Sequence, residues 1–178
     1  MDGPATSTSH LERLVVDLAE EVRGRYYGKY RGIVRDVDDP EGLGRIVASV
    51  PSVLGEEDTG WAVPAVPFAG DGHGLVLLPR VGDGVWIEFE GGDVSLPIWT
   101  GLWWGSGEMP GGADERTLLT PAGLKVVLDD SAKEIRLEHP DGPKITITGT
   151  AITLEVGGAK IVLSPTGVSI NDGAWTVR

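Results

Sequence analysis

The sequence predicts an all-β protein with a small closed barrel in its first half and a series of short strands in its second half. Its 27 Gly and 12 Pro among 178 residues make turns dense enough to favour many short strands over long helices. About five strand-like segments joined by tight turns lie between residues 26 and 106, which suits a small barrel. Beyond residue 116, apolar residues two positions apart recur every 7 to 10 residues.

A short α-helix is expected before the barrel. Ser9 followed by Glu12 reads as a capping box, in which each side chain satisfies a free backbone donor of the first turn. Gly24 is a natural stop for this helix. The apolar residues between these signals recur at helical spacing: Leu11, Leu14, Val15, Leu18 and Val22. Because this apolar stripe is narrow and the helix short, the helix must pack on something to be stable.

The expected domains are a helical extension (1–25), the barrel (26–106), a Gly/Pro/acid linker (107–116) and a strand repeat (117–178). Within the barrel, residues 61–67 are too proline-rich for a central strand, and residues 70–74 are expected to be a flexible connection. The residues that we expect to form strands or strand-like apolar runs are 30–37, 44–50, 75–78, 85–90 and 96–104.

The strand repeat offers about two apolar side chains on one face of each strand, which buries little within one chain. Wrapping identical chains around a shared axial core would close their edges and cover these side chains. An ordinary meander packed on the first domain is the alternative. The apolar pairs are Val126/Leu128, Ile135/Leu137, Ile145/Ile147, Ile152/Leu154, Ile161/Leu163 and Val168/Ile170.

The charge distribution disfavours nucleic acid as the main partner. The formal net charge is −12, and residues 1–106 carry 17 acids against 8 bases, so their surface repels phosphate. Five of those bases lie between residues 23 and 35. We interpret this basic cluster as a solvated helix end, which is a simpler explanation than an interface with an acidic neighbour. The first ten residues lack the apolar segment of a signal peptide, so we expect synthesis in the cytoplasm without one.

Four segments of the first half resemble the phage baseplate assembly protein V / VgrG family, the spike proteins of contractile injection systems. They are residues 30–34 (YRGIV), 44–51 (GRIVASVP), 79–93 (PRVGDGVWIEFEGGD) and 96–101 (LPIWTG). The resemblance implies an OB-fold barrel followed by a trimeric intertwined β-helix. It also implies a non-enzymatic central spike that joins tube or hub to the tip, punctures the target envelope, and is assembled into a phage virion or phage-tail-like particle.

The resemblance also implies partners and sites. The homotrimer core would consist of the six apolar pairs named above. Only some 25 residues precede the barrel, so a separate hub or baseplate protein would have to connect the spike to the tube, which favours a phage or phage-tail-like particle over a type VI apparatus. A PAAR-type cap is expected on the last residues, at Asp172, Gly173, Trp175 and Val177.

No catalytic, metal or cofactor site is expected. Cysteine is absent, and His10, His73 and His139 lack partners at metal-ligand spacing. Two other function classes remain. An OB-fold binder of nucleic acid or oligosaccharide would need a basic groove lined with aromatic residues. Of the adjacent Trp103 and Trp104, one must face outward, towards either a ligand or another subunit. A polysaccharide-active β-helix enzyme lacks its usual catalytic bases here.

Overall fold

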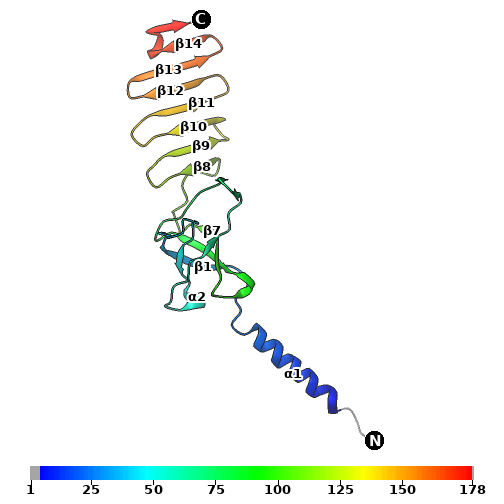
Figure 1. Cartoon of the computed structure of the whole chain (residues 1–178). Helices are drawn as coiled ribbons and strands as arrows, with labels where there is room; N and C mark the ends of the chain where they lie inside the picture. The colour runs from blue at the N-terminus through cyan, green and yellow to red at the C-terminus, as the bar shows by residue number, and fades with distance from the viewer. Residues whose placement is uncertain (1–4, 178) are drawn as a thin grey trace. The chain divides into compact units, whose positions relative to one another are not determined.

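The computed structural model describes residues 5–177 and divides the chain into two compact units, residues 1–107 and 108–178 (Figure 1). Both units are built mainly from β-strands, and their folds are described separately below. This architecture confirms the predicted all-β class with a short N-terminal helix. Within the described residues, no helix combines the length and the apolar character that a bilayer span requires.

Helix α1 (Ala5–Val22) begins earlier than its predicted capping box. Ser9 lies inside the helix rather than at its N-cap, so the capping-box prediction is wrong. The upstream residues continue the helix, and a residue with helical backbone on both sides cannot be a cap. The predicted stop is confirmed, because the helix ends two residues before Gly24, whose φ of +83° suits glycine.

The first unit contains a five-stranded sheet that curls around one core. Its strands are β1 (Tyr30–Asp36), β2 (Val47–Ser49), β3 (Val63–Pro64), β6 (Gly84–Phe89) and β7 (Pro97–Trp103), in the order β2-β1-β6-β7-β3. All neighbours are antiparallel except β3 and β7. Ile46 and Ala62 exchange backbone hydrogen bonds of 3.1 and 2.7 Å, which join the two outer strands of this order. The sheet therefore closes as an OB barrel does.

Alternation along the strands fills this barrel. Along β6, Val85, Ile87 and Phe89 are buried while the residues between them are half-buried on the outer face. Trp99 of β7 is also buried, and its indole N–H donates to the carbonyl of Gly44 at 3.0 Å. The other buried core residues are Val34, Ile46, Ala48, Val50 and Ala62.

An ion pair shapes the turn between β1 and β2. The Arg45 guanidinium donates to the Asp39 carboxylate at 2.6 and 3.0 Å. The same carboxylate accepts backbone N–H bonds from Glu41, Leu43 and Arg45. The bond from Arg45 is the main reason why the pKa of Asp39 lies well below its usual range.

The apolar run at residues 75–78 is not a strand, contrary to expectation. The preceding segment, predicted to be a flexible connection, instead forms a tight hairpin between β4 (Ala69–Gly70) and β5 (His73–Gly74). Residues 75–78 follow it without a partner strand, and their side chains are exposed. The proline-rich segment 61–67 contributes only β3, at the end of the sheet order, as its prolines require. Short helical turns, α2 (Pro51–Leu54) and η1 (Glu90–Gly92), complete the unit.

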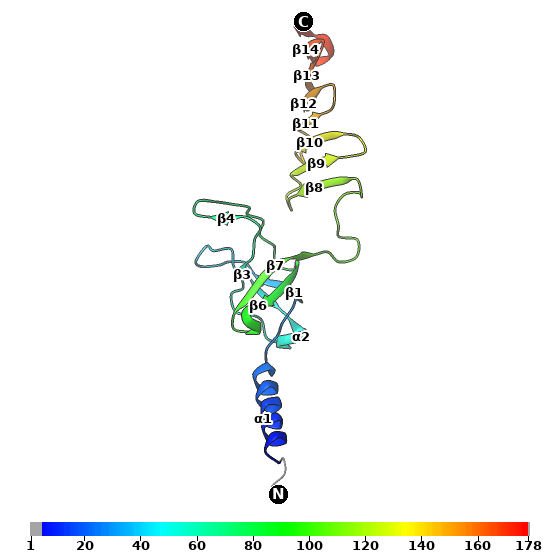
Figure 2. The same cartoon turned by 90° about the vertical axis from the view of Figure 1, so that its right-hand side faces the viewer.

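The second unit is one sheet of eight antiparallel strands that follow one another in sequence order (Figure 1). Figure 2 shows the strands of this unit nearly edge-on, as a single layer. The strands are β8 (Glu115–Leu119), β9 (Lys125–Asp129), β10 (Glu134–Glu138), β11 (Lys144–Ile147), β12 (Ile152–Val156), β13 (Ala159–Ser164), β14 (Gly167–Ile170) and β15 (Trp175–Val177).

Two of these strands were not among the six predicted ones. β8 includes Glu115 and Arg116, which we assigned to the linker, and β15 follows a 3-10 turn, η2 (Asn171–Gly173). Neither strand carries the two-apart aliphatic pair that identified the others. Inside the sheet each strand hydrogen-bonds to its neighbours in the same chain, so the sheet leaves open its face and its two end strands.

Replacing Ile87 with Ala tests the barrel core. The side chain is fully buried, and its truncation leaves a cavity that we expect to cost about 2–5 kcal/mol. Amides of β1 and β6 in the full-length protein should then exchange at least about tenfold faster in hydrogen-exchange mass spectrometry. Val81→Ala, at a side chain that is 60% exposed, is the control and should leave exchange unchanged. Equal rates in the two variants would contradict this core.

Candidate functional site

The apolar residues of the second unit form two rows on one face of its sheet. In antiparallel strands, residues directly opposite one another point to the same face. The strand registers place the first row at Leu118, Val126, Leu137, Ile145, Leu154, Ile161, Ile170 and Trp175, and the second at Leu128, Ile135, Ile147, Ile152, Leu163 and Val168. We call these two rows the apolar face. All the residues predicted for the trimer core lie on it.

The apolar face is uncovered within one chain. Ten of its fourteen side chains are exposed, from 37% at Leu154 to 57% at Trp175. The other four are half-buried: Val126, Ile145, Val168 and Ile170. Val127, on the opposite face, is the one fully buried apolar side chain among the described residues of this unit. A continuous apolar strip of this kind is typical of a surface that another molecule covers.

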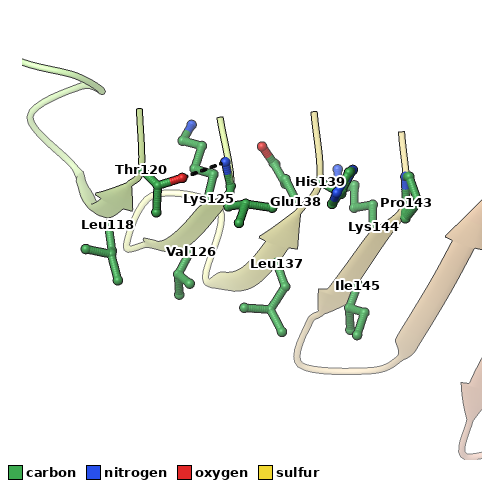
Figure 3. A pocket seen from close by; sticks show the side chains of 11 residues that line it. Leu118, Thr120, Lys125, Val126, Leu137, Glu138, His139, Pro143, Lys144 and Ile145 are labelled. Atoms are coloured by element: carbon green, nitrogen blue, oxygen red, sulfur yellow. Dashed lines mark hydrogen bonds between the residues drawn. The ribbon is translucent and has the colours of Figure 1, made fainter. Parts of the chain in front are cut away.

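The strip is hollowed into a groove of about 350 Å³ at the end formed by β8 to β11. Figure 3 shows Leu118, Val126, Leu137 and Ile145 pointing the same way from these four successive strands. Thr120, at one side of the groove, accepts a hydrogen bond from the backbone N–H of Leu124 at 3.1 Å. The groove therefore adjoins the apolar face, since four of its lining residues belong to the first row.

Sequence reasoning missed Leu118, the first residue of the first row. It belongs to the adjacent pair Leu118 and Leu119, which does not show the two-apart spacing of the other strands. Its position opposite Val126 in the β8–β9 ladder identifies it. The signal that could have found it is a seventh apolar segment, Leu118 and Leu119, which follows the linker directly.

The residues predicted to contact a cap lie at the last turn of the sheet. Asp172 and Gly173 belong to η2 and have positive φ values, 55° and 102°. Trp175 lies opposite Ile170 and so extends the first row. Val177 pairs through its backbone with Val168. The structure thus separates this group into two turn residues and two residues of the end strand.

Arg136 organises the opposite face of the sheet. Its side chain is only 12% exposed and bonds to Glu115 at 2.8 Å, Glu138 at 2.9 Å and Asp129 at 3.3 Å, as well as to Glu134. These bonds, with Glu134 the strongest, raise the pKa of Arg136. The backbone N–H of Ala132, assisted by the Ser131 hydroxyl and by Arg136, lowers the pKa of Asp129 to about 2. One cation thus ties strands β8, β9 and β10 together.

Alternating charges run along one margin of this polar face. Lys125 lies opposite Glu138, which lies opposite Lys144, followed by Glu155 and Lys160 on the next two strands. Opposite charges on neighbouring strands favour this register, because a slipped strand would lose its partners. A one-residue slip would also turn the apolar row of that strand to the polar face. The charge pattern therefore supports a continuous apolar face.

The basic cluster at residues 23–35 is mostly paired with acids of the barrel. Arg25 lies 3.3 Å from Asp93, and Lys29 lies 2.6 Å from Glu88. Arg35 lies 3.8 Å from Asp58. All three side chains remain 41–56% exposed to solvent, as expected. Helix α1 ends at Val22, however, so Lys29 and Arg35 do not lie at a helix end, and folding brings distant acids to them.

The outer face of the barrel carries two tryptophans, and the Arg31 side chain packs over both of their rings. Its guanidinium carbon lies 5.5 Å from the Trp86 ring centre and 5.2 Å from that of Trp103. Trp103 also donates its indole N–H to the carbonyl of Val85 at 3.1 Å. Trp104 is the outward-facing member of the adjacent pair, 64% exposed. This arrangement gives no support to a basic groove for nucleic acid.

A second apolar surface lies on the barrel. A cavity of about 560 Å³ opens between the turn at Leu43 and the hairpin segment that follows β3. Phe68 and the whole run 75–78 line it and are exposed. We call this surface the barrel groove.

No group of three His, Cys, Asp or Glu side chains in the described part of the chain is placed to hold a metal ion. The His73 ring contacts the backbone carbonyl of Asp71 at 3.0 Å rather than its carboxylate. His139 Nδ1 accepts the backbone N–H of Asp141 at 3.2 Å in an exposed turn. Among the described residues, the apolar face is therefore the candidate functional surface.

Replacing Asp129 with Asn tests the Arg136 cluster through its pH dependence. Because folding lowers the pKa of Asp129 to about 2, its contribution to stability is complete above about pH 4 and is lost as the pH falls through about 2. We therefore expect Asp129→Asn to lower the unfolding temperature at pH 6, with the gap to the unmodified protein closing towards pH 2.

Asp130→Asn, at an exposed side chain in a surface ion pair with Arg116, is the matched control and should change little at any pH. A gap for Asp129→Asn that stays constant between pH 6 and pH 2 would contradict the assignment.

Two matches to known families cover most of the chain. Residues 30–104 match the Type VI secretion system/phage-baseplate injector OB domain, and residues 115–176 match the phage baseplate V C-terminal trimerisation domain. A search among curated proteins finds no match. The two matched domains support a structural role of the baseplate-spike type and assembly into a phage or injection particle, and the second supports a homotrimer. With both domains present in the order OB barrel and then trimerisation sheet, the chain belongs to the phage baseplate V family of injector proteins.

Proposed function

We propose that this chain is the central spike of a contractile injection system or phage tail, formed by three copies that turn their apolar faces to one axis. The observation that carries the proposal is the apolar face, whose first row runs over all eight strands and whose second row runs over the six strands from β9 to β14. Covering each half-exposed Leu or Ile contributes roughly 1 kcal/mol. The apolar face of every chain supplies eleven Leu or Ile side chains. The trimerisation match supports three copies.

The proposed spike is a β-helical needle in which each chain supplies one wall. The interior strands already pair within their own chain, so the contacts between copies are made by the apolar faces and by residues along the margins of the sheets. With the polar face outward, the Arg136 cluster and the alternating lysines and glutamates meet solvent. This arrangement leaves the apolar side chains dry and the charged ones hydrated.

Penetration of a target envelope is the mechanical task that such a needle suits. Resistance to forced unfolding depends on the unfolding rate rather than on the equilibrium free energy. A sheet whose eight strands are all paired, and whose face is buried against two other copies, must break many contacts at once to open. We propose this as the reason for so long a run of short, closely connected strands, and the role requires no enzymatic activity.

The proposed partners lie at two places. A separate hub or baseplate protein would attach the spike to the tube, and the barrel groove with Phe68 and residues 75–78 is the apolar surface of the barrel that suits it. A PAAR-type cap would cover the last turn, at Asp172, Gly173, Trp175 and Val177. The target envelope would be met only during injection, after assembly of the protein into its particle.

Replacing Leu154 with Asp tests the needle. Three copies of the new carboxylate would meet near the axis, where each uncompensated charge costs several kcal/mol. We expect light scattering to show the mass falling from three chains to one. The control is Thr153→Asp, which adds the same charge to the same strand on the opposite face and should remain a trimer. Ile147→Asp should behave as Leu154→Asp does.

A trimer of unchanged thermal stability in Leu154→Asp would contradict the axial position of the apolar face. Dissociation of both variants would show only that β12 is sensitive to charge, and would also count against the proposal.

Removing the sheet tests where the trimer is held. The full-length protein should have the mass of three chains, while a chain that ends at Glu108 should be a monomer or a weak trimer, because it lacks the apolar face. Light scattering over about a hundredfold range of concentration distinguishes these outcomes. A monomeric full-length protein would overturn the spike proposal.

A further inference from the structure

Helix α1 carries apolar side chains that nothing in the described chain covers. Leu11, Leu14, Val15 and Leu18 are each half or more exposed, and so is Val22 at the end of the helix. An isolated helix of 18 residues is marginal in water, so a partner must stabilise it. The spike proposal does not use this helix.

The apolar positions of α1 follow a heptad pattern. Leu11, Val15, Leu18 and Val22 are spaced four, three and four residues apart, which is the d–a–d–a seam of a coiled coil. Leu14 and Ala19 flank this seam at the g and e positions. In two-stranded coiled coils these flanking positions are usually charged, so an apolar pair there indicates a wider seam that contacts more than one neighbour.

Three of the five charged residues between Leu11 and Val22 lie away from the seam. Asp17 is at a c position, and Arg13 and Glu20 are at f positions, while Glu12 and Glu21 flank the seam at e and g. Identical helices in parallel bring the g position of one next to the e position of the following heptad in another. This places Leu14 next to Ala19 and Glu12 next to Ser7, so the two flanking acids do not face each other.

The helix is connected closely to the barrel, which belongs to the proposed trimer. Only two residues separate Val22 from Arg25, which lies 3.3 Å from Asp93, and the N–H of Tyr26 donates to the carbonyl of Gly92 at 2.8 Å. A rotation axis through the trimer gives three such helices the same height and the same polarity along the axis. Each heptad layer would then meet its own equivalent in the other copies.

We propose that the α1 helices of three copies pack together as a short parallel coiled coil through Leu11, Val15, Leu18 and Val22. The inference rests on the homotrimer of the proposed function. Tethering to a trimer gives the helices an effective concentration in the millimolar range, which compensates for the small number of layers. The helices that precede the barrel in sequence and the sheets that follow it would then both contribute to the contacts between copies.

Disulfide trapping tests the coiled coil, since the chain has no cysteine of its own. Leu18→Cys places thiols at a d position, close enough for a bond between two copies, whereas Glu20→Cys places them at the outer f position. Under mild oxidation, we expect up to two of every three Leu18→Cys chains to run as disulfide-linked dimers in a non-reducing gel. Fewer than about one in ten Glu20→Cys chains should do so.

Light scattering on the same samples separates this inference from the proposed function. A trimer in which Leu18→Cys links no better than Glu20→Cys would overturn the coiled coil and leave the spike standing. A monomer without links would overturn both.

Hydrogen exchange of the full-length protein gives a second measurement. We expect the α1 amides to be protected in the trimer, and Val15→Asp to remove that protection by at least about tenfold while the trimer mass is retained. Asp17→Asn, on the outer side, should leave it unchanged. Protected α1 amides without disulfide trapping at Leu18 would show that the helix docks elsewhere, for example in the barrel groove, and would overturn the proposal.

Discussion

The constraint on which this molecule depends is that a single-layer sheet cannot bury its own apolar face. Eight short strands place most of their aliphatic residues in two rows on one side, and the described residues of that unit form no second layer to cover them. Another molecule must therefore cover the apolar face. The surface that matches a repeating apolar strip most simply is the same strip on two further copies of the chain. This constraint explains why a sheet of this kind would occur in a trimerisation domain, the family that residues 115–176 match.

The barrel solves the same problem within one chain. Its sheet curls until Ile46 meets Ala62, and nine buried residues fill the interior. Its surface cations at Arg25, Lys29 and Arg35 pair with acids, while Arg31 lies over two tryptophans. The barrel is thus a closed module that presents apolar contacts at one groove. The sheet of the second unit and helix α1 instead leave their apolar side chains exposed. The barrel therefore buries its core within one chain, whereas the sheet and the helix need another molecule to cover them.

The polar interactions on the sheet stabilise the register of its strands rather than a contact with a partner. The Arg136 cluster joins three strands around one buried guanidinium, and the alternating lysines and glutamates oppose a slip of neighbouring strands. Register matters here because a slip of one residue would interrupt the apolar rows. The polar face therefore determines whether the apolar face is continuous enough to associate.

The sequence by itself determined the all-β class, the OB barrel strands near 30–36, 84–89 and 97–103, and the membership of the apolar face, since a period of two assigns Val126 to Ile170 to one side of any strand. It did not determine the upstream start of α1, the hairpin at residues 69–74 or the exposed run at 75–78, because each depends on which backbone partners are within reach. It also missed Leu118, the continuation of the first row at Trp175 and the pairing of the basic cluster with Asp93, Glu88 and Asp58. Those contacts join residues far apart in the chain or lie at strand ends, where only the folded register fixes which side chains meet.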